Sequence, residues 1–160
     1  MSPLFVGLGS NLGSREQNIQ LAIHFMTERV GLFVKCSSLF ETAPVGFSSD
    51  HLFLNAVALF QTQLSPEQLL TETQAIEKRM GRSEKSHDGQ HFDRIIDIDL
   101  LMLGNLVVET PELSLPHKHM TSRRFVMEPF AEIAPDCVHP VFGKTMRQLL
   151  QKLEEDKTVN

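Results

Sequence analysis

The alternation of apolar and polar residues divides the chain into short buried strands and two amphipathic helices. The apolar run 4–8 ends at glycine and is typical of a buried strand. Apolar positions then recur three or four residues apart over 19–30 and again over 69–80, which predicts one buried face on each of two helices. In order, the pattern predicts strands at 4–8, 32–40, 53–62 and 95–103 and helices at 14–30 and 65–80.

Local signals set the expected ends of these elements. A serine or threonine followed three residues later by glutamine predicts a capped helix start. Such pairs are Ser14 with Gln17, Ser65 with Gln68, and Thr145 with Gln148. We expect a turn at 9–13 and a hairpin at Gly104-Asn105 that leads into a strand at 106–108. The last third is expected to contain a loop through Pro116, a short helix at 128–134 and a final helix after Thr145.

The element order β-α-β-β-α-β indicates an α+β fold of the ferredoxin-like type. This fold has an antiparallel sheet with helices packed on it, and here it is followed by a C-terminal extension. A chain of 160 residues is long enough to bury one core and too short for two ordinary domains. We therefore expect a single domain over residues 1–160.

Two aspartates interrupt the otherwise aliphatic strand at 95–103. Because side chains alternate along a strand, Asp97 and Asp99 share one face, with backbones about 6.5–7 Å apart. Two close carboxylates repel each other unless cations neutralise them, and Mg²⁺ commonly uses one or two carboxylates together with substrate phosphates. Aspartate on a solvated face is the alternative, but it is depleted in strands. The pair predicts a metal site.

Cationic residues flank this strand. The segment 82–94 has no aliphatic side chain and carries much charge, so we expect a long loop of the kind that often covers a site. Arginine matches phosphate oxygens in geometry and keeps its charge. The candidate phosphate-binding residues are Arg82, Lys85, Arg94, His117, Arg123 and Arg124. Considered singly, Lys85 and Arg124 fit solvated charges, and His117 fits a structural histidine.

A third group of residues fits a flat heterocycle. The turn 42–46 together with Phe53 and Asn55 offers backbone groups, one ring and one amide. By itself Phe53 fits an ordinary core position equally well. The glycine-rich segment 7–13 lacks the Gly-Lys-Ser/Thr ending of a phosphate-binding loop, so no phosphate site is assigned to it.

Composition narrows the class of partner. A net charge of −5 argues against bulk binding of nucleic acid or anionic membrane. No apolar run approaches the length of a membrane span, and the start Met1-Ser2-Pro3 lacks a basic, cleavable leader, so a cytoplasmic protein is expected. Cys36 and Cys137 are expected to be free thiols. The acidic single domain favours a monomer.

Together these segments resemble the 6-hydroxymethyl-7,8-dihydropterin pyrophosphokinase family along nearly the whole chain, from 4 to about 150. The matching pieces are Gly9-Ser10-Asn11-Leu12, Glu41-Thr42-Ala43-Pro44-Val45-Gly46, Phe53-Leu54-Asn55-Ala56, Glu77, Gly81-Arg82, Arg94 with Asp97-Ile98-Asp99, and Pro116-His117 with Arg123 and Phe125. The Arg-x-x-Asp-x-Asp segment followed by Pro-His about twenty residues later is the most specific of these.

The resemblance implies transfer of pyrophosphate from ATP to the hydroxymethyl group of the pterin, with release of AMP. It implies that Asp97 and Asp99 hold two Mg²⁺ ions and that Arg82 and Arg94 act on the triphosphate. It further implies that ATP contacts Gln74, Glu77, Arg82, Arg94, His117 and Arg123, and that the pterin contacts Thr42, Ala43, Val45, Phe53, Asn55 and Phe125. No general base is implied.

The chain departs from the family pattern at a few positions. A Trp-Gly-Pro-Arg stretch usual in the loop is absent, and Gly89-Gln90-His91-Phe92-Asp93 leads to Arg94 instead. Glu84 aligns with a usual arginine, Phe53 replaces a tyrosine, and Lys118 stands where a tyrosine often follows the histidine. These differences predict the same reaction with altered behaviour of the loop as a lid and altered nucleotide affinity.

Two other classes of function use the same features. Another metal-dependent phosphotransferase or nucleotidyltransferase would share the carboxylates but release pyrophosphate. A small-molecule binding or regulatory domain would bind a ligand without turnover, and it would make the charged loop and the aspartate pair coincidental.

Overall fold

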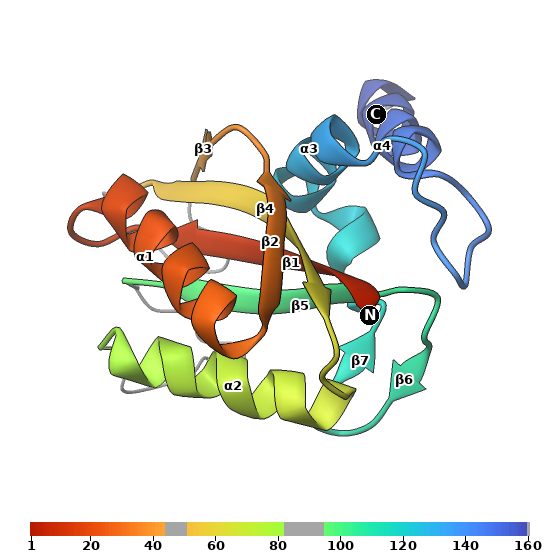
Figure 1. Ribbon diagram of the computed structural model, residues 1–160. Coiled ribbons are helices and arrows are strands. Elements are labelled where there is room, and N and C mark those ends of the chain that lie inside the picture. The colour runs from red at the N-terminus through yellow and green to blue at the C-terminus, as the bar shows by residue number, and fades with distance from the viewer. Residues whose placement is uncertain (44–50, 82–94, 160) are drawn as a thin grey trace.

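The computed structural model describes residues 1–43, 51–81 and 95–159 and forms a mixed helix and sheet structure (Figure 1). The elements are β1 Ser2–Ser10, α1 Arg15–Arg29, β2 Gly31–Cys36, β3 Phe40–Thr42, β4 Phe53–Thr62, α2 Pro66–Arg79, β5 Asp97–Leu103, β6 Val108–Glu109, β7 Ser114–Leu115, a 3-10 turn Met120–Ser122, α3 Arg124–Ile133 and α4 Met146–Val159.

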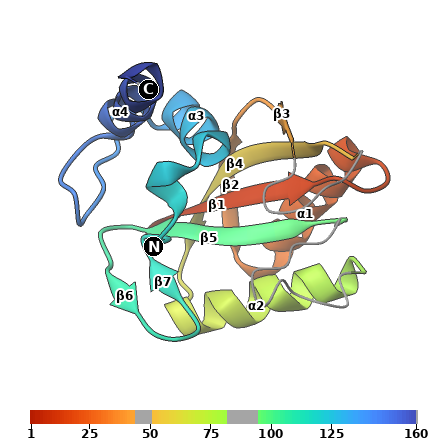
Figure 2. The ribbon, with the colours of Figure 1, turned by 180° about the vertical axis from the view of Figure 1, so that it is seen from behind.

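The main sheet has the order β2-β4-β1-β5, with β3 paired to β4, and all of these pairs are antiparallel. The first and last strands of the β-α-β-β-α-β order thus lie side by side, and β5 forms one edge. This arrangement confirms the predicted ferredoxin-like sheet. Figure 2 shows the same sheet from behind, with the strands in front of α1.

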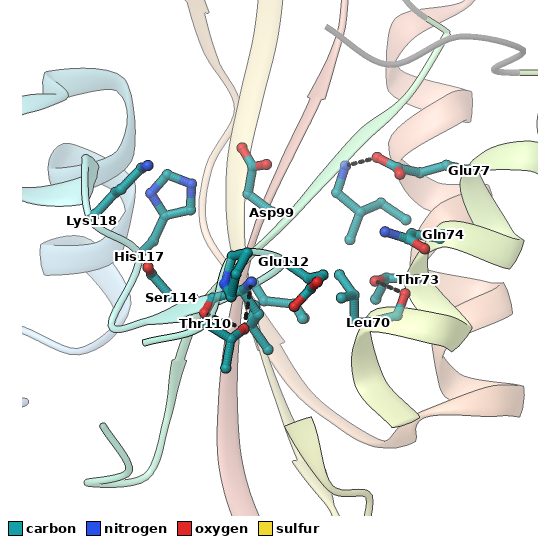
Figure 3. A pocket seen from close by; sticks show the side chains of 14 residues that line it. Leu70, Thr73, Gln74, Glu77, Asp99, Thr110, Glu112, Ser114, His117 and Lys118 are labelled. Carbon is teal, nitrogen blue, oxygen red and sulfur yellow. Dashed lines mark hydrogen bonds between the residues drawn. The ribbon is translucent and has the colours of Figure 1, made fainter. Parts of the chain in front are cut away.

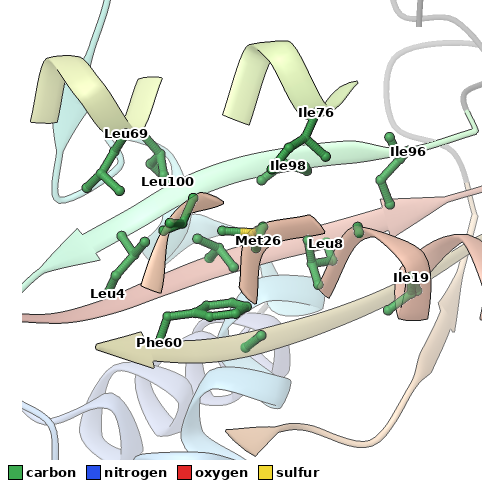
Figure 4. Close-up of a cluster of buried hydrophobic side chains, with 14 of the residues drawn as sticks. Leu4, Leu8, Ile19, Met26, Phe60, Leu69, Ile76, Ile96, Ile98 and Leu100 are labelled. Carbon is green, nitrogen blue, oxygen red and sulfur yellow. The ribbon is translucent and has the colours of Figure 1, made fainter. Parts of the chain in front are cut away.

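The period of two in the strands assigns their residues to two faces. On one face Leu4, Val6 and Leu8 of β1 join one hydrophobic cluster with residues of α1 and α2 (Figure 4). Ile96, Ile98 and Leu100 belong to the same cluster, which confirms that they point into the core. Burial of each such side chain contributes about 1.5–3 kcal/mol, so this face supplies the main core.

The opposite face is covered at one end by the C-terminal extension. Phe5 of β1 stacks on Phe130 of α3, with ring centroids 4.4 Å apart. Val57 and Leu101 join the same second cluster, together with residues of α3 and α4. Helices therefore pack on both faces of the sheet. The end of the second face that α3 does not cover carries the residues of the candidate site described below.

Several local predictions were wrong at their boundaries. The strand expected at 32–40 is divided into β2 and β3. The hairpin expected from β5 into 106–108 does not form, because β6 pairs with β7 while β5 uses the distant β1 as its partner. The helix expected at 128–134 is α3, which begins at Arg124.

Two of the three predicted capping boxes are confirmed. Ser65 and Gln68 exchange both hydrogen bonds, at 3.2 and 2.9 Å, and Thr145 and Gln148 do so at 3.1 and 2.9 Å. Ser14 is the N-cap residue of α1 but makes no side-chain cap hydrogen bond. No helix within the described ranges is long and apolar enough to cross a membrane.

Candidate functional site

The sheet face beside α3 carries both aspartates next to glycines. Asp97 pairs with Gly9 and Asp99 with Gly7 across β5 and β1. A Cβ atom built on Gly9 would lie 3.3 Å from Oδ1 of Asn55 and 3.6 Å from Cδ1 of Phe53. Glycine at these two positions means that β1 places no side chain beside the two carboxylates. Sequence reasoning placed Gly9 in a turn, whereas β1 continues through Ser10.

The predicted heterocycle residues are brought together by the pairing of β3 with β4. Thr42 lies opposite Phe53, and Asn55 lies opposite Gly9 on β1. Asn55 is buried, and its Nδ2 donates to Oγ1 of Thr42 at 2.7 Å and to the carbonyl of Phe40 at 3.3 Å. These bonds orient the amide so that Oδ1 faces the space at Gly9. Ala43 follows β3 and is exposed, and Val45 lies outside the described residues.

A pocket of about 250 Å³ opens between α2, β5 and the segment 110–118 (Figure 3). It brings together four predicted residues, namely Gln74, Glu77, Asp99 and His117. The other residues that line it are Leu70, Thr73, Ile98, Leu100, Thr110, Pro111, Glu112, Leu113, Ser114 and Lys118. The lining combines aliphatic side chains of α2, β5 and the segment 110–118 with a larger number of polar and charged groups, which fits an organic ligand that carries charge.

Glu77 holds the edge of β5 in place. Its carboxylate is buried, and Oε2 accepts a hydrogen bond from the backbone N–H of Ile98 at 2.8 Å. Ile98 lies between the two aspartates, and because β5 is an edge strand of the described sheet, its outward N–H faces no other described strand. Glu77 therefore satisfies this donor and helps to position both carboxylates.

Replacing Glu77 with alanine should lower the free energy of unfolding by about 1–3 kcal/mol, because the buried Ile98 N–H loses its acceptor. Glu77→Gln keeps a carbonyl acceptor and should recover most of that loss. Chemical denaturation of both variants measures the effect. Equal stability of the alanine variant and the wild type would contradict the role given to Glu77.

His117 is held by its own backbone and a neighbouring amide. The backbone N–H of His117 donates to the carbonyl of Leu101 at 2.8 Å, and the ring atom Nδ1 of His117 accepts from the backbone N–H of His119 at 3.2 Å. The pKa of His117 is lowered to about 4, mainly by burial and then by the charge of Arg123, while Asp97 acts in the opposite direction. At neutral pH the ring is therefore uncharged, and Nε2 carries the proton as a hydrogen-bond donor.

The lowered pKa of His117 predicts a dependence of stability on acid. The unfolded state binds a proton near the ordinary pKa of 6.5 and the folded state only near 4, so protonation favours unfolding. The stabilising contribution is complete above pH 6.5 and is lost as the pH falls toward 4. Denaturation of the ligand-free protein across this range should show a shallower decline for His117→Gln. An unchanged decline would contradict the assignment.

The arginines after His117 differ in their surroundings. The Arg123 guanidinium lies 5.7 Å from the ring centroid of Phe125, and its charge acts on His117. Arg124 instead forms ion pairs with Glu128 and Glu154 on helices α3 and α4. The interpretation of Arg124 as a solvated surface charge therefore fits the structure. Arg82, Lys85 and Arg94 lie outside the described residues.

Sequence reasoning missed two parts of the site. Thr110 to Ser114 line the pocket, yet nothing in their sequence marks them, because only the fold brings them beside β5. The Gly-Ser-Asn-Leu segment has a positional role: Nδ2 of Asn11 donates to the carbonyl of His51 at 3.1 Å, just before β4. Arg15 likewise contacts the carbonyl of Leu52 at 2.9 Å and Glu41 at 2.8 Å.

The donor set near Asp97 and Asp99 fits a magnesium ion that shares its shell with a ligand. In the described part of the chain, no three His, Cys, Asp or Glu side chains converge as a complete metal site. Mg²⁺ does not require one, since it commonly takes one or two carboxylates plus phosphate oxygens and water. Gly7 and Gly9 bring no β1 side chain next to these carboxylates, where phosphate oxygens and water would complete the shell.

Comparison with known proteins supports one family. Residues 5–135 match the family model described as 7,8-dihydro-6-hydroxymethylpterin-pyrophosphokinase (HPPK). The chain is 43% identical over 141 residues to the 2-amino-4-hydroxy-6-hydroxymethyldihydropteridine pyrophosphokinase of Porphyromonas gingivalis, covering 88% of this chain and 95% of that protein. A protein of the same description from Aquifex aeolicus is 35% identical, with 92% and 90% covered.

Longer proteins contain a similar segment. The folic acid synthesis protein fol1 of Pneumocystis carinii is 38% identical over 94% of this chain, which spans 20% of that protein. The crystal structure of Plasmodium falciparum HPPK-DHPS wild type with pterin and p-hydroxybenzoate matches with a TM-score of 0.79 at 17% identity. That match covers 98% of this chain and 44% of the solved chain, and it bears on the fold alone.

The family model covers most of the chain, and full-length relatives exceed 30% identity over nearly their whole length. The chain therefore belongs to the 7,8-dihydro-6-hydroxymethylpterin-pyrophosphokinase family.

Proposed function

We propose that the two aspartates, the pocket and the Thr42–Asn55 group together form the active site of this pyrophosphokinase. The chain transfers a pyrophosphoryl group to hydroxymethyldihydropterin in folate biosynthesis. The roles of the individual residues are the proposal. The observation that supports it most is the strand register, in which Gly9 of β1 lies opposite Asn55 of β4 on one side and Asp97 of β5 on the other. The amide proposed for the heterocycle and the carboxylate proposed for the metal and phosphates thus lie on one face of the sheet.

ATP is assigned to the pocket. Leu70, Ile98 and Leu100 offer apolar surface for the base, and Gln74 offers an amide. The phosphates extend toward Asp97 and Asp99, where His117 donates through Nε2 and Arg123 adds positive charge. Arg82 and Arg94 complete the proposed phosphate contacts, on the basis of the family resemblance alone.

The pterin is assigned to the space at Gly9. Asn55 presents Oδ1 there, held by its bonds to Thr42 and Phe40. Phe53 supplies one ring at this position, and Phe125 at the start of α3 is proposed as the second. Ala43 and Val45 are proposed as backbone contacts. This placement brings the hydroxymethyl group toward the carboxylates.

The proposed reaction is an in-line displacement. The hydroxymethyl oxygen forms a bond to the β-phosphorus of ATP, the bond from that phosphorus to the bridging α,β-oxygen breaks, and AMP leaves with that oxygen. Because the transition state of phosphoryl transfer is loose, positioning and charge stabilisation contribute most of the catalysis. We assign no general base among the side chains that the structure describes.

Asp97 and Asp99 are the proposed magnesium ligands, with two ions expected. When bound, Mg²⁺ would neutralise part of the negative charge of the triphosphate, which an acidic protein otherwise repels. The number of ions can be tested without turnover, by titrating Mn²⁺ into the protein with a non-hydrolysable ATP analogue and counting bound metal by electron paramagnetic resonance. Two ions per chain support the proposal, and loss of binding in Asp97→Asn and Asp99→Asn identifies the ligands.

Product analysis by ³¹P NMR tests the reaction directly. With ATP, Mg²⁺ and 6-hydroxymethyl-7,8-dihydropterin, AMP should form only when the pterin is present. A nucleotidyltransferase would release pyrophosphate instead, and a binding domain would give no product. Either result would overturn the proposal.

Three expectations from the sequence stay predictions. The cytoplasmic location and the monomeric state are untested, and analytical ultracentrifugation can decide the latter. A single cooperative unfolding transition would support one domain over residues 1–160.

A further inference from the structure

The described walls of the pocket carry an unequal distribution of charge. Glu77, Asp99 and Glu112 contribute carboxylates, whereas Lys118 is the one positively charged side chain among the described lining residues. A nucleotide triphosphate brings several further negative charges. Positive charge within reach of the phosphates therefore has a large effect on affinity in this pocket.

Lys118 is positioned by the residue before it. The His117 backbone is fixed by its N–H bond to the Leu101 carbonyl, and its own carbonyl accepts from the N–H of Met120 at 3.2 Å. Figure 3 shows Lys118 and His117 on one side of Asp99, with Glu77 and Gln74 on the other. The ammonium is also close enough to His117 for its charge to lower the pKa of that ring.

Among the described residues, the Lys118 ammonium forms no ion pair. The ion pairs formed between described residues have Arg15, Arg29, Arg124 and Arg147 as the cations, and His24 contacts Glu28. Neither Lys118 nor Arg123 has a carboxylate partner within the part of the chain that the structure describes. The charges of both cations act on His117, as does that of Asp97, so both cations lie where a phosphate group near Asp97 can be reached.

We propose that Lys118 contacts the phosphate chain of the nucleotide and makes this pocket select nucleotides with more phosphate groups. This inference rests on the assignment of ATP to the pocket. Lys118 is therefore assigned as a specificity-determining residue of this chain. An ammonium is a compact charge that binds phosphate oxygens without a fixed geometry, and Lys118→Arg should preserve most of its effect.

Isothermal titration calorimetry with ATP, ADP and AMP, each with Mg²⁺, tests the proposal. Lys118→Met keeps the length of the side chain and removes its charge. We expect ATP affinity to fall about tenfold and AMP affinity less than about threefold, as for loss of one charge-assisted contact to the outer phosphates. The loss of ATP affinity in Lys118→Met should become smaller as the salt concentration is raised. In steady-state assays the KM for ATP should rise while kcat stays within about threefold.

Lys144→Met is the matched control, because Lys144 is exposed, lies outside the pocket and carries the same charge. It should bind all three nucleotides like the wild type. Unchanged ATP affinity in Lys118→Met would overturn the proposal, as would equal losses for ATP, ADP and AMP or an equal loss in Lys144→Met. A wild-type protein that binds no ATP would overturn the proposed function itself, and this inference with it.

Discussion

Replacing Asp99 with asparagine is expected to lower kcat for pterin-dependent AMP formation by at least about 10³-fold, since loss of metal-assisted charge stabilisation raises the barrier by several kcal/mol. Asp97→Asn should have a comparable effect. Asparagine keeps the size of the side chain and removes its charge, so the fold is preserved. Rapid-quench measurement of AMP at saturating substrates reports the chemical step rather than binding.

Glu112→Gln is the matched control for these variants. Glu112 also lines the pocket, and the change removes the same charge, but Glu112 lies in the segment between β6 and β7 and not on β5, the strand that carries the aspartates. Its kcat should stay within about threefold of the wild type. If the Asp99 and Glu112 variants lose the same activity, the aspartates act through the overall charge of the pocket and the proposed metal role fails.

Replacing Gly9 with valine is expected to weaken pterin binding about tenfold to a hundredfold, equivalent to about 1.4–2.8 kcal/mol. A Cβ alone would lie 3.3 Å from Asn55 Oδ1, and the added methyl groups fill the space assigned to the heterocycle. Valine is favourable in strands, so a large loss of stability is not expected. Fluorescence titration with the pterin measures the change, and ATP affinity should stay within about twofold.

Gly7→Ala provides the comparison on the same strand and the same face. There an added Cβ meets side-chain atoms of Leu101 and Asp99 no closer than 3.7 Å, which is an ordinary contact. Pterin affinity should therefore be nearly unchanged. If Gly9→Val binds the pterin as tightly as the wild type does, the space at Gly9 is not part of the pterin site.

Prediction from the sequence succeeded where a local pattern and a buried face agree. The strand at 53–62 is found with its predicted bounds, and the apolar positions of 19–30 and 69–80 supply buried residues of α1 and α2. Prediction failed where a distant partner decided the outcome. A hairpin from β5 into 106–108 was predicted, but β5 pairs with β1 from the start of the chain, and β6 pairs with β7.

The sequence by itself determined the fold class, the main core and the chemistry available to the site. Strand and helix periods assign Ile98 to the core, and the spacing of Asp97 and Asp99 places both carboxylates on the opposite face. These properties depend on neighbours within a few residues, so they can be predicted from a single sequence.

Only the tertiary structure decided which distant residues meet. Register across β4, β1 and β5 aligns Asn55, Gly9 and Asp97, and Glu77 reaches the backbone of β5 from α2. The segment 110–118 becomes a pocket wall through its position beside β5. Such contacts depend on how whole elements pack, and that is set by the total burial of apolar surface rather than by any local signal in one sequence.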